Sequence, residues 1–124
     1  MNAFLFYTGS AVIFLWGLGH LVPTRKIVQG FGSISKDNVR IITMEWISEG
    51  LSLCFIGVLV FITTLISGPK SQAIKIVGPV CAFMLLVMAT LSILTGARTT
   101  ILPMRICPII KTITAALFLW GTYL

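Results

Sequence analysis

Four long apolar runs constrain this chain more than any other feature of its sequence. A helix needs about 20 largely apolar residues to cross a bilayer, and four segments reach that length, at residues 2–22, 37–67, 72–96 and 103–124. Hydrophobic residues form 57% of the 124-residue chain and charged residues only 10%, against about a quarter in soluble domains. The sequence therefore predicts one all-α transmembrane domain over residues 1–124.

The breaks between the runs are short and carry turn residues. Pro23 closes the first run, the stretch "QGFGSISKDN" reads as a loop, and "SGPKS" and "GARTTILP" separate the later runs. Short connections make consecutive helices antiparallel neighbours, so we expect an up-down-up-down four-helix bundle in the membrane. Small residues such as Gly50 and Gly57 should let helices approach closely.

Basic residues are unevenly distributed among these breaks. Seven lie in or beside the first and third connections and two beside the second; they are Arg25, Lys26, Lys36, Arg40, Arg98, Arg105 and Lys111 against Lys70 and Lys75. The positive-inside rule then places the first and third connections in the cytoplasm and both termini outside. The net charge of +6 comes without a long basic stripe or aromatic platform, which argues against nucleic acid and favours contact with the bilayer's anionic headgroups.

Motifs that carry chemistry are scarce. The three cysteines are spread singly, and there is no nucleotide-binding loop, nucleophilic triad or zinc motif. His20, Glu45 and Glu49 could supply one nitrogen and two oxygens, but di-metal carboxylate bundles use Glu-x-x-His pairs on two helices. With one histidine in the chain, we predict no metal site; the sequence leaves the question of a cofactor open.

The stretch "ITMEWISEG" places two carboxylates, Glu45 and Glu49, one turn apart at the start of an apolar run. With Ser52 they follow the spacing i, i+4, i+7 and share one helical face, which Asn38 extends toward the cytoplasm. Ionisable groups in a membrane are costly and face the bundle interior or an interface. We therefore expect this polar stripe to point into the bundle or toward another subunit, and Trp46 to face lipid or core elsewhere.

Polar residues of the other helices should meet this stripe at one depth. His20 ends the first helix, Arg98 ends the third, and Lys111 lies near the start of the fourth. Two adjacent carboxylates repel, so either they share a proton or one of these groups pairs with them. We predict Glu45, Glu49 and His20 as catalytic groups and Arg98, Ser52, Asn38 and Lys111 as ligand-binding groups. The alternative is an ion pair that only fixes helix packing.

The stretch "GLGHLVPTRK" at the end of the first helix resembles the corresponding stretch of DoxX-like membrane proteins, which are also small four-helix proteins. The matching residues are Gly17, His20 and Pro23. Members of that family are linked with quinone-dependent redox complexes. The resemblance implies an accessory or redox-linked membrane subunit.

Three functions fit these features. The first is a site for binding, or acid–base chemistry on, a small apolar molecule such as a lipid, isoprenoid or quinone. The second is a non-catalytic subunit of a larger membrane complex, with the polar stripe as its seam to a partner or to another copy of the chain. The third is an oligomeric channel or proton-coupled transporter whose path the carboxylates line.

Overall fold

A computed structural model describes all 124 residues, and every regular element in it is helical. The four long helices are α1 (Asn2–Leu21), α3 (Lys36–Ser67), α4 (Gln72–Leu94) and α5 (Leu102–Tyr123). Each is long and apolar enough to cross a membrane. The expected all-α class and the four apolar helices are confirmed.

Two short elements lie in connections that the sequence predicted as irregular. They are the helix α2 (Thr24–Gln29) and the 3₁₀ turn η1 (Gly96–Arg98). The long helices α3 and α4 begin at serine caps, because Ser35 Oγ accepts the N–H of Asn38 at 3.1 Å and Ser71 Oγ accepts that of Ile74 at 3.2 Å. Such caps satisfy N–H groups that the helix itself leaves free.

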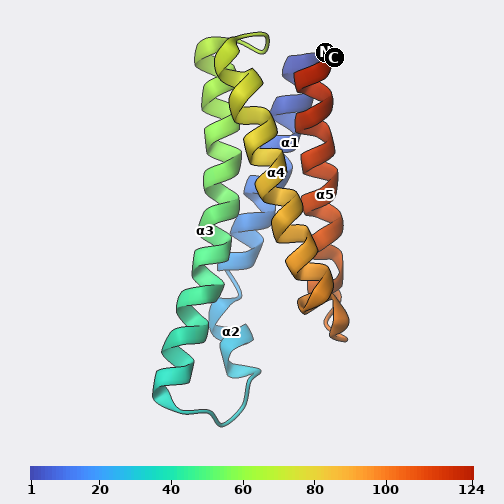
Figure 1. Cartoon of the computed structure of the whole chain (residues 1–124). Coiled ribbons are helices and arrows are strands. Elements are labelled where there is room, and N and C mark those ends of the chain that lie inside the picture. The colour runs from blue at the N-terminus through green and yellow to red at the C-terminus, as the bar shows by residue number, and fades with distance from the viewer.

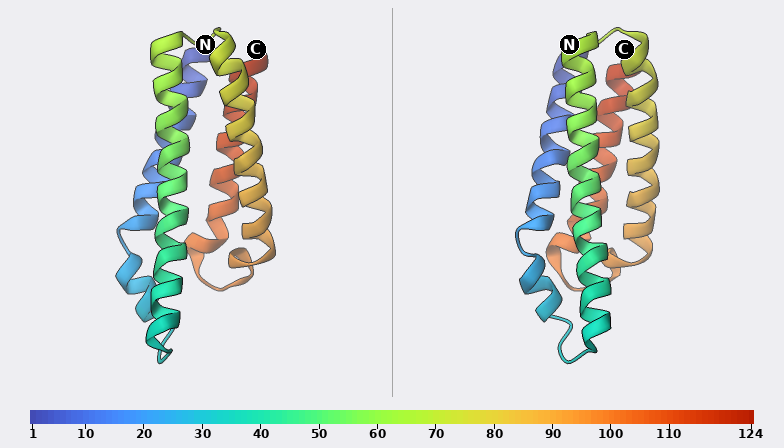
Figure 2. Two further views of the ribbon diagram at one scale, coloured as in Figure 1. Left: turned by 60° about the vertical axis from the view of Figure 1, so that its left-hand side comes forward. Right: turned by 90° about the vertical axis from the view of Figure 1, so that its left-hand side faces the viewer.

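The helices form a bundle in which both chain termini lie at the same end, beside the connection between α3 and α4 (Figures 1 and 2). α2 and the connection between α4 and α5 lie at the opposite end. α1 packs along α3 and α5, and α4 packs along α5, whereas α3 and α4 touch each other much less. The seam between α3 and α4 is therefore the open side of the bundle.

The helix α3 extends beyond the others at its N-terminal end. Its 32 residues span about 48 Å, against about 30 Å for the 20 residues of α1, at about 1.5 Å per residue. The overhanging first turns run beside α2, below the ends of α1 and α4 (Figure 1). As a result, the turns of α3 that carry Glu45 and Glu49 lie level with the last turns of α1 and α4.

Glycines bring α1 and α3 close together. A Cβ atom on Gly17 would lie only 2.9 Å from the carbonyl oxygen of Gly50, and one on Gly57 would lie 2.8 Å from that of Ser10. These contacts are with backbone, which cannot turn aside as a flexible side chain can. The expected close approach at Gly50 and Gly57 is confirmed, and it fixes the position of α3 against the last turn of α1.

Candidate functional site

The carboxylate of Glu49 on α3 is the centre of a cluster drawn from all four long helices. His20 Nε2, in the last turn of α1, lies 3.2 Å from Glu49 Oε2, and Lys111 Nζ of α5 lies 2.5 Å from Oε1. Lys111 Nζ also donates to Ser92 Oγ of α4 at 2.9 Å. One carboxylate therefore bridges an imidazole and an ammonium across the bundle.

Lys111 is fully buried. An ammonium taken out of water is strongly destabilised unless an opposite charge and hydrogen bonds replace its hydration. Glu49 supplies the charge, and Ser92 supplies a second acceptor. The position of Lys111 in the middle of an apolar helix thus depends on Glu49.

Trp46 stacks on His20 and hydrogen-bonds to its backbone. The imidazole is only 6% exposed, and its ring stacks on the indole of Trp46 with centroids 4.0 Å apart and planes 14° from parallel. Trp46 Nε1 also donates to the carbonyl oxygen of His20 at 2.6 Å. Trp46 was expected to face elsewhere; its i, i+3 spacing to Glu49 is the signal that could have placed it beside the carboxylate.

The contact between His20 and Glu49 has ion-pair distance but not the angles of a hydrogen bond. His20 Nε2 is consequently a buried ring nitrogen without a hydrogen-bond partner. Buried polar atoms in folded proteins are nearly always paired, and an exception needs a reason. A bound molecule that reaches Nε2 would provide the missing partner.

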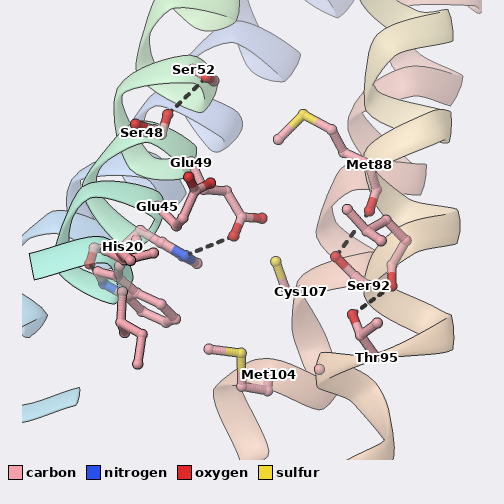
Figure 3. Close-up of a pocket in the computed structure, with 15 residues that line it drawn as sticks. His20, Glu45, Ser48, Glu49, Ser52, Met88, Ser92, Thr95, Met104 and Cys107 are labelled. Atoms are coloured by element: carbon pink, nitrogen blue, oxygen red, sulfur yellow. Dashed lines mark hydrogen bonds and ion pairs between the residues drawn. The ribbon is translucent and has the colours of Figure 1, made fainter. Parts of the chain in front are cut away.

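Such a molecule has room, because a cavity of about 470 Å³ lies in front of His20 between α3 and α4. Figure 3 shows the side chains of α3 and α4 facing each other across it, with His20 on the α3 side and Met104 and Cys107 of α5 below. Its polar lining residues are His20, Glu45, Ser48, Glu49, Ser52, Ser92 and Thr95. Cys107 is held in place by Trp16, whose Nε1 donates to its sulfur at 3.3 Å.

The polar cavity continues into an apolar groove along the same open seam. This groove has a volume of about 480 Å³ and shares Ser52 with the cavity. Its other lining residues are Leu51, Phe55, Ile56, Leu59, Val80, Cys81 and Met84. The seam is thus polar at one end and apolar toward the middle of the helices.

The structure separates the predicted site residues into two groups. Glu45 and Ser52 line the cavity with His20 and Glu49, and Lys111 reaches Glu49 from α5. Asn38 and Arg98 are exposed and do not line it. Asn38 lies in the first turn of α3, and Arg98 makes no ion pair with either glutamate. The 3₁₀ turn after α4, which the sequence did not predict, sets the position of Arg98.

The α4 side of the cavity was missed as a site by reasoning from the sequence. Met88, Ser92 and Thr95 lie at i, i+4 and i+7, a spacing that places them on one face of the helix. That stripe was the available signal. Histidine, cysteine and acidic side chains do not gather anywhere into a group of three that could hold a metal ion.

No protein-family model, curated protein or solved structure matches this chain. The resemblance to DoxX-like proteins stays a prediction. What the cavity can do chemically follows from its atoms: an imidazole and a carboxylate in contact can hold a proton and pass it on.

Proposed function

We propose that this chain is a multi-pass membrane protein that binds a small amphipathic molecule, of the lipid, isoprenoid or quinone kind, through the open seam between α3 and α4. The polar head would lie in the cavity against His20 Nε2, and the apolar part would lie in the groove. The observation that supports this most directly is His20 Nε2, a buried atom that contacts Glu49 without making a hydrogen bond, at the polar end of a seam whose other end is apolar.

The three ionisable groups of the cluster would have different roles in acid–base chemistry. A neutral imidazole can accept a proton from the head group, and the adjacent Glu49 carboxylate would stabilise the imidazolium that forms. Lys111 would hold Glu49 in position through its own ion pair. Glu45, exposed at the cavity, would exchange the proton with water.

The proposed orientation in the cell membrane places the cavity at the cytoplasmic end. Lys111, counted with the third connection in the sequence, is instead buried in the bundle. Without it, the basic residues still number six against two. That bias supports an orientation with α2 and the connection between α4 and α5 in the cytoplasm and the termini outside.

A photoreactive isoprenoid alcohol tests the proposal. The full chain is reconstituted in phosphatidylcholine nanodiscs, labelled with a farnesol analogue that carries a diazirine on its tail, and mapped by mass spectrometry. We expect labelling to concentrate on residues 51–59 and 80–88, and to fall in His20→Ala and in the milder His20→Asn. Arg98→Ala, outside the cavity, is the control. Equal labelling of the lipid-facing surfaces of all four helices would contradict the proposal.

A further inference from the structure

Of the hydroxyl groups that line the cavity, all but that of Ser48 have already used their protons. Ser52 Oγ donates to the carbonyl oxygen of Ser48 at 2.7 Å, and Thr95 Oγ1 donates to that of Leu91 at 2.7 Å. Ser92 Oγ donates to the carbonyl oxygen of Met88 at 2.9 Å. A hydroxyl has one proton but two lone pairs, so what these side chains offer a ligand is acceptors.

The charged groups at the cavity also favour a positively charged donor. The cation nearest to it, Lys111, is bound to Glu49 and Ser92 and does not line the cavity. Glu45 lines the cavity and has no ion-pair partner. Arg98 and Arg105 lie at the same end of the bundle, but both are exposed and neither lines the cavity. One carboxylate at the cavity is thus left without a counter-charge.

The carboxylate of Glu49, which also lines the cavity, completes the set. Its Oε1 accepts from Lys111, whereas its Oε2 lies 3.2 Å from His20 Nε2 and accepts no further hydrogen bond. A carboxylate oxygen is an acceptor only, so Glu49 adds lone pairs and no donor. Together with the Glu45 carboxylate and the hydroxyl lone pairs, it makes the cavity a surface of acceptors.

We infer that the head group bound here is a hydrogen-bond donor with a positive charge, a protonated amine on an apolar chain. The inference rests on the proposed function and narrows its ligand class. Its N–H groups would donate to the carboxylates of Glu45 and Glu49 and to the serine lone pairs, and its charge would offset that of Glu45. A carboxylate or phosphate head would meet acceptors and a like charge, and a head with only carbonyl oxygens would leave the acceptors unsatisfied.

Four amphiphiles with the same twelve-carbon chain separate these properties. Dodecylamine has both charge and N–H donors, dodecyltrimethylammonium has charge only, dodecanol has one uncharged donor, and dodecanoate is an anion. Each competes against the photoreactive farnesol analogue on the full chain in phosphatidylcholine nanodiscs. Concentrations are corrected for partition into the lipid.

We expect dodecylamine to compete best, at a concentration at least about tenfold below that of dodecanoate, which is a difference of about 1.4 kcal/mol. Glu45→Gln should reduce this ratio by about tenfold. Asp37→Asn, which removes another exposed carboxylate of α3 outside the cavity, should leave the ratio unchanged.

The other results overturn the inference in distinguishable ways. If dodecanoate competes as well as dodecylamine, the donor preference is wrong while the proposed binding site stands. If dodecyltrimethylammonium equals dodecylamine, charge alone decides and N–H donation does not. If none of the four displaces the probe, the proposed function is wrong as well.

Discussion

Replacement of Glu49 by glutamine should destabilise this protein chiefly through Lys111. The change keeps the shape of the side chain but removes the charge that faces a fully buried ammonium. Lys111 then keeps only Ser92 as a partner. Because α5 packs against both α1 and α4, the ammonium cannot reach water without a local opening of the bundle.

The magnitude follows from the burial of the two partners. Breaking a buried ion pair by removing one member costs about 3–5 kcal/mol. Glu49 itself is 33% exposed, and a partly solvated partner gives a weaker pair, so we expect the lower end, about 3 kcal/mol. Replacing both members by uncharged residues, Glu49→Gln with Lys111→Met, removes the stranded charge and should cost about 1 kcal/mol or less.

Equilibrium unfolding in mixed detergent micelles measures these differences. The double variant should be more stable than Glu49→Gln alone by about 2 kcal/mol, a factor of about 30 in the folding equilibrium. Glu45→Gln is the matched control on the same helix and should stay within about 0.5 kcal/mol of the unmodified protein. If Glu49→Gln also stays within that limit, or if Lys111→Met gives no rescue, burial of Lys111 does not depend on Glu49.

Three further predictions concern packing, the support of His20 and orientation. Gly17→Ala should destabilise the protein by about 1–3 kcal/mol, because the added Cβ meets the backbone of α3. Gly19→Ala is the control: nothing lies within 4 Å of its Cβ, so it should not lower stability in the same unfolding assay. Trp46→Phe should lower the free energy of unfolding by about 1 kcal/mol, because it keeps an aromatic ring on His20 but removes the hydrogen bond to the His20 carbonyl; unchanged stability would contradict that role. In a variant whose native cysteines are replaced by alanine, a membrane-impermeant maleimide added to intact cells should label Ser67→Cys but not Ser33→Cys or Thr100→Cys, and the reverse pattern would contradict the proposed orientation.

The helices could be predicted because the features that specify them lie within each segment of the sequence. Twenty or more apolar residues between turn signals are enough to specify a membrane-length helix, and α1, α3, α4 and α5 all follow from that pattern. The short α2 and η1 could not be predicted in the same way. Elements of six and three residues depend on what they pack against rather than on their own composition.

Part of the site followed from one idea, that ionisable groups in a membrane helix must find partners. The idea pointed to His20, Glu49 and Lys111, which do lie together. The same idea predicted a partner for Arg98. Arg98 is exposed at a helix end, however, where water can solvate its charge, so it needs no partner. Exposure, which decides between these cases, is a property of the folded bundle and not of the residue type.

The two glutamates that are one turn apart on α3 have different surroundings, and this bears on whether the pair is structural or functional. Glu49 is engaged by a buried cation and an imidazole, so removing it should be felt first as a loss of stability. Glu45 is exposed, lines the cavity and has no counter-charge, so it should contribute little to the stability of the fold. A structural ion pair accounts for Glu49 and Lys111, but it does not account for a carboxylate kept unpaired at the mouth of an acceptor-lined cavity. We therefore expect substitutions at Glu45 to change ligand preference with little effect on stability, and substitutions at Glu49 to change both.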